Sequence, residues 1–285
     1  MCDETQQFFE RAAVVSAYEL TVRHSRTQFS TNAPHTEGEM CELVIYTEAG
    51  KSVCVENSVY VTTGFCAFTF RPGELHFGIH RPMNVHERYV ITFHPAKLRT
   101  IPGGDILLRI FFDREAGTRN MIVLPYEAER LLCSYIESIF TASERKDAVT
   151  DTAVMAYMIC LLDLLGQYFM KDNSPTNAVG DVLHDILDDM EQRYMTTASL
   201  SEYASAAGIS LSTMERLFKS SLQMTPGQYL NARRMECAMH MLRNGYSVTD
   251  TCFLSGFRDY SHFIANFRRQ VGITPAQYQK MQTEK

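Results

Sequence analysis

Two segments in the C-terminal third of the chain carry side chains that can bind phosphate groups and the edges of nucleic-acid bases. Arginine offers a planar set of donors that fits a phosphate or a guanine edge, and hydroxyl groups add further hydrogen bonds. The candidates for this chemistry are Ser212, Thr213, Glu215, Arg216 and Lys219 in the first segment and Tyr260, Ser261, His262, Arg268 and Arg269 in the second.

Each charged candidate also has a purely structural alternative. Arg216 is the strongest candidate for reading a base or binding a phosphate, but it could instead form an ion pair inside its own domain. Glu215 could accept a hydrogen bond from cytosine, or it could hold Arg216 or Lys219 in place. Arg268 and Arg269 suit phosphate contacts, which position a protein on DNA without reading its sequence.

The two segments belong to an internal repeat. FKSSLQMTPGQYL, which starts at Phe218, returns as FRRQVGITPAQYQ from Phe267. Upstream of these stretches Gly208 aligns with Gly256 and Met214 with Phe263. A repeat of this kind predicts two copies of one structural unit.

Each copy has the pattern of a helix, a tight turn and a second helix. Gly208 and Gly256 suit a turn that needs positive φ. Ser210 and Asp259 can then cap the second helix by accepting backbone N–H bonds. This order of elements predicts a helix-turn-helix. The two predicted units span residues 200–221 and 248–270.

The segment between the copies, PGQYLNARRMECAMHMLRNG, starts with proline and stops at Asn-Gly, which predicts one long linker helix. Such a helix would hold both second helices rigidly, so that they could enter successive major grooves about 34 Å apart. Arg233 and Arg234 on it are expected to brace the domain internally; contact with DNA is the alternative. Ala265 stands where the first copy has Arg216, so we expect the second copy to make fewer base contacts.

Charge is distributed unevenly along the chain. The net charge of −6 argues by itself against a nucleic-acid partner, but residues 199–285 carry 10 Lys and Arg against 6 Asp and Glu.

No apolar run approaches the roughly 18 residues of a membrane span. The start, MCDETQQFFE, lacks the pattern of a signal peptide. We therefore expect a cytoplasmic protein that does not associate with membranes.

Four stretches of the C-terminal third carry a resemblance to a known family: A-x-x-x-G-I-S at 204–210, R-L-F-K at 216–219, Y-L-N-A-R-R at 229–234 and SGFRDYSHFIANFRRQVGITPAQY at 255–278. On these stretches the chain resembles the DNA-binding domain of the AraC-type transcription regulators. The resemblance implies two helix-turn-helix units in residues 179–285, double-stranded DNA as partner, and RNA polymerase as a further partner. Gln223 departs from the family, which usually has Gly there, and a locally different turn is expected because Gln reaches positive φ at a cost of about 1 kcal/mol.

The N-terminal part predicts short strands. VCVEN, SVYVTT, FCAFTF and YVITF alternate apolar and polar residues between turn signals, which is typical of a small barrel or sandwich. Two motifs stand out here: Pro34-His35 a few residues before Glu42-Leu43, and Gly64 leading into RPGELH at 71–76. With these motifs, residues 1–123 resemble the cupin-like sensor domain of many AraC-type regulators. The paired H-x-H of metal-binding cupins is absent, so we expect no metal and no other cofactor. The candidate effector-binding residues, for each of which an ordinary barrel role is the alternative, are His35, Glu42, Tyr46, Phe68, Arg71, His76 and Arg88.

Residues 124–170 predict a helical hairpin, because apolar residues recur at helical spacing on both sides of a short polar turn. Its apolar stripe could cover the barrel and also meet a partner chain, so we expect it to form the dimer interface; packing within the domain alone is the alternative. Residues 171–178 are polar and contain proline, which predicts a linker. The predicted fold class is α+β with two domains: a cupin-like β-barrel with a helical hairpin, then an all-α double helix-turn-helix.

The leading hypothesis is a homodimeric, sequence-specific DNA-binding regulator, an activator, that responds to a small-molecule effector in the barrel. It is not an enzyme under this hypothesis. Two alternatives stay open: a metal-dependent cupin enzyme fused to a DNA-binding module, and a ligand-free regulator whose N-terminal domain only oligomerises. The sequence does not identify the effector or the target operon.

Overall fold

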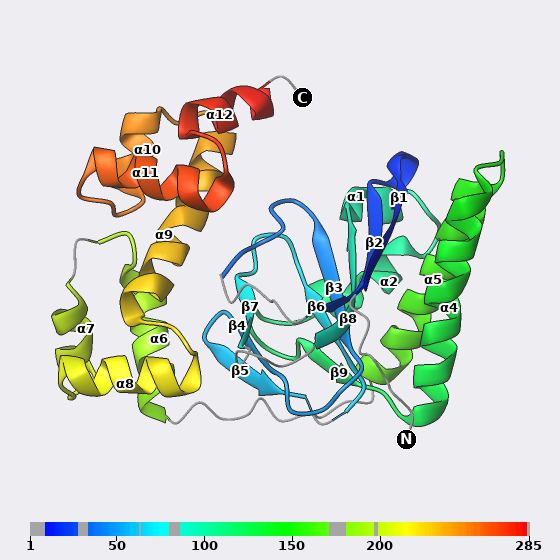
Figure 1. Cartoon of the computed structure of the whole chain (residues 1–285), viewed down its shortest axis with the longest axis horizontal. Helices are drawn as coiled ribbons and strands as arrows, with labels where there is room; N and C mark the ends of the chain where they lie inside the picture. The colour runs from blue at the N-terminus through cyan, green and yellow to red at the C-terminus, as the bar shows by residue number, and fades with distance from the viewer. Residues whose placement is uncertain are drawn as a thin grey trace. The chain divides into compact units, whose positions relative to one another are not determined.

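The computed structural model describes residues 9–27, 34–62, 64–79, 86–170, 181–196 and 199–283. The chain forms two compact units (Figure 1). The first contains strands β1 to β9 and helices α1 to α5, and the second contains helices α6 to α12. A β-rich unit followed by an all-helical unit confirms the predicted α+β class. The predicted linker, residues 171–178, lies outside the described residues.

The described strands form two antiparallel sheets. The larger has the order β1-β2-β8-β3-β6-β9, and the smaller has the order β5-β4-β7. Residues of both sheets meet in one apolar cluster, so the sheets pack face to face. The strands are β1 (Phe9–Val15), β2 (Leu20–Thr27), β3 (Cys41–Tyr46), β4 (Ser52–Val55), β5 (Ser58–Val61), β6 (Cys66–Phe70), β7 (His76–Ile79), β8 (His86–Phe93) and β9 (Met121–Val123).

Strand β3 lies within the larger sheet and is buried on both faces. Leu43 and Ile45 belong to the core that helices α4 and α5 complete. Val44 and Tyr46 belong to the second core, between the two sheets. Successive side chains of a strand point to opposite faces. Glu42 therefore also points between the sheets, where it is 4% exposed.

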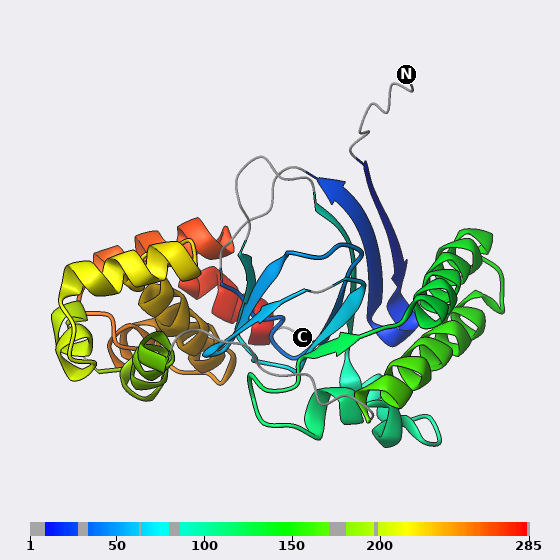
Figure 2. The same ribbon diagram turned by 90° about the horizontal axis from the view of Figure 1, so that it is seen from below.

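Helices α4 (Tyr126–Arg145) and α5 (Thr150–Phe169) form a hairpin that covers the outer face of the larger sheet (Figures 1 and 2). By length and composition alone α5 could cross a membrane, with a mean hydropathy of 1.4 over its most apolar window. A core helix passes the same test, and α5 buries Val154, Leu161 and Leu165 against the sheet. Three short α-helices lie between β8 and β9: α1 (Pro95–Arg99), α2 (Gly104–Leu107) and α3 (Arg109–Phe112). A 3-10 helix, Ser16–Tyr18, joins β1 to β2.

A buried ion pair ties together the loops at one end of the first unit. Arg114 donates to both carboxylate oxygens of Glu74 at 2.7 Å, and neither side chain is exposed. The Glu74 carboxylate also accepts from the backbone N–H of Gly117 and the amide of Asn120, at 2.8 and 3.1 Å. Burial acts to raise the pKa of Glu74, but the hydrogen bonds and the charge of Arg114, together with the backbone N–H groups of Gly117 and Arg71, outweigh it and lower that pKa below its ordinary value.

The second unit consists of helices joined by tight turns. Gly208 and Gly256 have φ of 69° and 93°, the left-handed region that the repeat predicted for them. A side chain at Gly256 would place its Cβ 2.6 Å from the carbonyl oxygen of Tyr194, so only glycine fits there. The helices are α6 (Asp181–Arg193), α7 (Leu200–Ala206), α8 (Leu211–Ser221), α9 (Pro226–Arg243), α10 (Val248–Leu254), α11 (Tyr260–Val271) and α12 (Pro275–Thr283).

Helix α9 runs from α8 to the α10–α11 pair (Figure 1) and packs against both. Near its start the ring of Tyr229 contacts Phe218 of α8, with centroids 6.0 Å apart. Near its end Ala238 and Leu242 are buried beside Phe263 and Phe267 of α11. One helix therefore supplies core residues to both helix-turn-helix units.

Arg233 and Arg234 of α9 brace the unit internally, as predicted. Arg233 forms an ion pair with Glu191 of α6. Arg234 donates from Nε to the carbonyl of Tyr194 at 2.7 Å and from Nη2 to that of Thr196 at 2.9 Å. Both guanidinium groups are thus engaged in holding α9 to the segment at and after the end of α6.

The turns after α8 and α11 both contain a left-handed residue at the matching position, whereas we expected a different turn at Gln223. Gln223 has φ of 55°, and Gly272, its counterpart in the second copy, has φ of 84°. Both residues are left-handed, so the first copy keeps the turn and bears the strain of a non-glycine residue.

We expect Glu74→Gln to weaken the first unit by about 3–5 kcal/mol, because it leaves the Arg114 charge buried and unpaired. Hydrogen–deuterium exchange of the full chain should then show lost protection in β6 and β9. Arg109→Met is the matched control, since the Arg109–Asp113 pair is more than half exposed. That exposed pair should contribute less than about 1 kcal/mol. Equal protection in the wild-type chain and Glu74→Gln would contradict the structural role of the buried pair.

Gln223→Gly should stabilise the second unit by up to about 1 kcal/mol, because glycine adopts positive φ without steric penalty. The reciprocal change, Gly272→Gln, should destabilise it by a similar amount; no atom lies within 4 Å of a Cβ there, so backbone strain is the only penalty. Scanning calorimetry of the full chain checks both. Shifts of the same sign in the two variants would show that strain at this turn does not control stability.

Candidate functional site

The second helices of the two repeats, α8 and α11, are amphipathic in the same register. Met214 and Phe218 are fully buried on α8, and Phe263 and Phe267 are fully buried at the matching positions of α11. Each helix is capped by the predicted residue: the Ser210 hydroxyl accepts from the N–H of Thr213 at 3.1 Å, and the Asp259 carboxylate accepts from that of His262 at 2.6 Å. The opposite faces of both helices are therefore left toward solvent.

The outward face of α8 carries the first group of predicted residues. Glu215, Arg216 and Lys219 are exposed, and they make no hydrogen bond or ion pair with any residue that the structure describes. The described residues therefore show no intradomain ion pair for Arg216 and no bracing contact from Glu215 to Arg216 or Lys219. Ser212 and Thr213 have hydroxyls 3.0 and 2.8 Å from that of Ser210, at the helix start.

The outward face of α11 carries the second group. Arg268 is exposed and unpaired among the described residues. Arg269 donates to the side-chain oxygen of Asn266, whose amide lies 3.2 Å from the imidazole of His262. Tyr260 is 42% exposed, and Ser261 is exposed beside it. The ten predicted residues thus gather on two equivalent helices of one unit.

Arg258 is a further basic residue that the repeat did not single out. It lies between Gly256 and the cap residue Asp259, in the stretch where the second copy has one residue more than the first. Arg258 is exposed, makes no hydrogen bond or ion pair with the described residues, and lines a hollow of about 370 Å³ with Arg234 and His262. The inserted residue was the signal in the sequence that could have identified it.

In the first unit, some predicted effector residues belong to the packed core. Phe68 is fully buried. The rings of Tyr46 and Tyr60 meet its ring edge-to-face, with centroids 5.8 and 5.7 Å away. Burial raises the pKa of Tyr46 to about 12. Arg71 is half-buried and donates to the backbone carbonyl of Arg114, and Arg88 contacts Tyr46.

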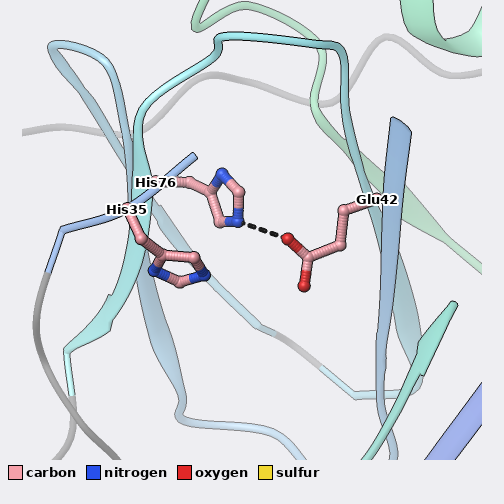
Figure 3. A group of neighbouring side chains, drawn as sticks. All are labelled: His35, Glu42 and His76. Atoms are coloured by element: carbon pink, nitrogen blue, oxygen red, sulfur yellow. Dashed lines mark hydrogen bonds and ion pairs between the residues drawn. The ribbon is translucent and has the colours of Figure 1, made fainter. Parts of the chain in front are cut away.

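Glu42 and His76 form a buried pair that joins the two sheets (Figure 3). His76 Nε2 lies 2.8 Å from the Glu42 carboxylate, and Nδ1 lies 2.9 Å from the carbonyl oxygen of Glu74. The ring stacks on Phe70 with centroids 3.7 Å apart. Burial acts to lower the pKa of His76, but the Glu42 carboxylate outweighs it and raises that pKa above its ordinary value. Since both ring nitrogens face acceptors, a charged imidazolium satisfies both.

His35, which is exposed, completes a group whose side chains lie close enough together to hold a metal ion. The candidate ligand atoms of His35, Glu42 and His76 all lie within 4.8 Å of one another (Figure 3). Two nitrogens and one carboxylate oxygen are a donor set that transition metals accept. Glu42 and His76 already satisfy each other, however, so the buried pair does not need an ion to compensate it.

Comparisons with known proteins agree with the C-terminal repeat. Residues 203–281 match the family model described as a helix-turn-helix domain. The transcriptional activator RhaS of Klebsiella pneumoniae (strain 342) is 29% identical over 155 residues, which are 53% of this chain and 55% of RhaS. The chain thus spans about half the length of the RhaS proteins that it matches.

Two further proteins extend the comparison. A crystal structure of a Chromobacterium violaceum transcriptional regulator with an AraC-type DNA-binding domain is 26% identical, covers 35% of this chain and 91% of that one, and has a TM-score of 0.33. The thermoregulatory protein LcrF of Yersinia pestis is 34% identical over 201 residues, 65% of this chain and 73% of LcrF. Because that match extends well beyond the repeat, the chain belongs to the AraC family of transcription regulators.

Proposed function

We propose that the protein is a sequence-specific DNA-binding transcription regulator that acts as an activator. One observation carries this proposal: the two repeated helices expose matching faces whose basic residues Arg216, Lys219 and Arg268 have no partner among the described residues. Unpaired cations on a solvated helix face are available to phosphates and base edges. The relatives RhaS and LcrF, described as a transcriptional activator and a thermoregulatory protein, support the regulatory role.

The two helices divide the contacts between them. Arg216 lies at the middle of the outward face of α8, from which a guanidinium can reach the O6 and N7 of guanine. Ser212, Thr213 and Lys219 flank it, with Glu215 available to a cytosine amino group. On α11, Arg268 and Arg269 bind phosphates, and Tyr260, Ser261 and His262 lie at the end of the helix that enters the groove. Arg258 adds a phosphate contact before α11.

Helix α9 sets the distance between the two reading helices. It contains 18 residues. At about 1.5 Å of rise per residue, a helix of this length extends for about 27 Å. That length is comparable to the roughly 34 Å between successive major grooves on one face of DNA. One protomer then occupies two grooves, with RNA polymerase as a further partner at the promoter. The site of action is the cytoplasm.

The first unit transmits an effector signal in this proposal. The Glu42–His76 pair joins the two sheets, so a small molecule that competes for either group would change how the sheets pack. His35, Arg71 and Arg88 are the more exposed candidates around it, whereas Phe68 and Tyr46 act through the core. The packed interior around Phe68 favours one alternative, a regulator without a ligand, whose first unit serves only for assembly.

The hairpin of α4 and α5 is the proposed homodimer interface. Helix α5 is apolar enough to resemble a membrane span, yet only 44% of its most apolar window is buried within the chain. Small residues, Ala156 and Cys160, are exposed one turn apart on it and would let a second helix approach closely. Tyr126 and Leu131 of α4, which are 67% and 42% exposed, extend the apolar surface.

A gel-shift titration against selected duplexes tests the central proposal. A random duplex library gives the preferred site, and the full chain is then titrated at several salt concentrations. Specific binding that weakens steeply with salt is expected, because each phosphate contact releases counterions. Equal affinity for the selected and scrambled duplexes would overturn the function proposed here.

Arg216→Ala should weaken binding to the selected site by about 1–3 kcal/mol and relax the preference at one base pair. Arg268→Ala should instead weaken binding to all sequences alike and reduce the salt slope by about 1. Arg145→Ala, an exposed arginine of the first unit, is the charge-matched control and should change neither quantity. Identical profiles for the Arg216 and Arg268 variants would contradict the division of contacts between α8 and α11.

Ala156→Glu should convert a dimer to a monomer, because it places a charge in the proposed α5 interface. Sedimentation equilibrium of the full chain measures the change. Thr249→Glu, at an exposed position of α10, adds the same charge outside the hairpin and should leave the dimer intact. A dimer that survives Ala156→Glu would place the interface elsewhere.

A further inference from the structure

The centre of the α11 outward face carries a side chain with no polar group. Ala265 is exposed and occupies the position that Arg216 occupies on α8. The two helices share buried residues, caps and preceding glycine turns, so the two side chains leave equivalent backbones in equivalent directions. The same surface therefore presents a guanidinium in one copy and a methyl group in the other.

Ala265 lines a shallow, open hollow of about 720 Å³ on the surface of α11. Ile264 is half-buried and supplies an apolar wall, and Arg268 follows Ala265 by one helical turn. None of the lining residues is acidic. The hollow therefore combines an apolar floor with a cationic rim, which suits an uncharged group attached to a phosphate backbone. The lining residues are Tyr260, Ser261, Ile264, Ala265, Arg268, Arg269 and Thr274.

An alanine side chain can recognise a base edge only through apolar contact, because it has neither donor nor acceptor. The major-groove edges of the four base pairs carry a single apolar group, the 5-methyl group of thymine. We propose that α11 reads a thymine, through contact of that methyl group with Ala265. The proposal rests on the DNA-binding function proposed above and names the base that the second unit recognises.

The two copies would then read different chemistry from one scaffold. The groove that α8 enters offers guanine to Arg216, and the groove that α11 enters, one helical turn away, offers thymine to Ala265. Arg268, on the rim of the hollow, holds the adjacent phosphate and so fixes the distance from helix to base. The binding site for one protomer is therefore asymmetric in sequence although the protein unit is repeated.

Replacement of thymine by deoxyuridine tests the proposal, because the two bases differ only by the methyl group. The base pair at which Arg216→Ala relaxes the sequence preference marks the α8 groove, and the α11 groove lies one helical turn away. The probes are copies of the selected duplex in which one thymine of the α11 groove at a time is replaced by deoxyuridine. One replacement should weaken binding by the wild-type chain about fourfold, the effect of a buried methyl or methylene group. The remaining replacements should change the affinity less than twofold.

Ala265→Gly should abolish the difference between thymine and deoxyuridine at that position. The readout is the ratio of two affinities for one protein, so a general loss of helix stability from glycine cancels. Ala265→Ser, in which serine is a better helix former than glycine, should also reduce the ratio of the thymine and deoxyuridine affinities. Arg216→Ala should keep that ratio at about fourfold. A wild-type chain insensitive to every replacement, or an unchanged ratio in Ala265→Gly, overturns the thymine contact while specific binding persists. Equal affinity of the wild-type chain for the selected and scrambled duplexes would instead overturn the DNA-binding function itself.

Discussion

The second unit depends on the continuity of helix α9. Its first turns pack on α8 through Tyr229 and Phe218, and its last turns pack on α11 through Leu242 and Phe267. Capping fixes where this helix starts, since the Thr225 hydroxyl accepts from the N–H of Gln228 and the Gln228 side chain accepts from the N–H of Thr225. Because a straight helix cannot stretch, the distance between α8 and α11 is fixed when α9 folds. In the function proposed above, that fixed distance lets the two helix-turn-helix units act as one DNA-binding surface.

Buried polar pairs hold the strands and loops of the first unit in place, whereas the second unit depends on helix α9. Glu74 and Arg114 lock the loops beside β6 and β9, and Glu42 and His76 join the two sheets across the interior. Breaking either pair would leave a charge buried without a partner, which is strongly unfavourable. These pairs restrict the sheets to one arrangement. In the function proposed above, a ligand that takes one member of the Glu42–His76 pair would disturb the other, because the two groups are partners.

The repeat, its glycine turns and its caps could be predicted from sequence because each depends on local chemistry. Gly208 and Gly256 need positive φ, and Ser210 and Asp259 cap the helices that follow. The turn at Gln223 was predicted wrongly, because the shared scaffold imposes left-handed backbone even where the sequence has no glycine. Arg114 was missed, since its partner Glu74 lies forty residues earlier and only the fold brings them together. The positions of Phe68 and Tyr46 in a packed interior likewise depend on contacts between the two sheets.

The claim that α9 fixes the spacing of the two reading helices is tested most directly by changing the spacing of the DNA. Five and ten base pairs are inserted in turn between the two grooves of the selected duplex, and the affinity of the full chain is measured for each. A rigid α9 predicts that both insertions reduce the affinity to the level of a duplex carrying only one groove site, because even a full helical turn moves the second site out of reach. Retained affinity with the ten-base-pair insertion would show that the two units bind independently, and would contradict the account.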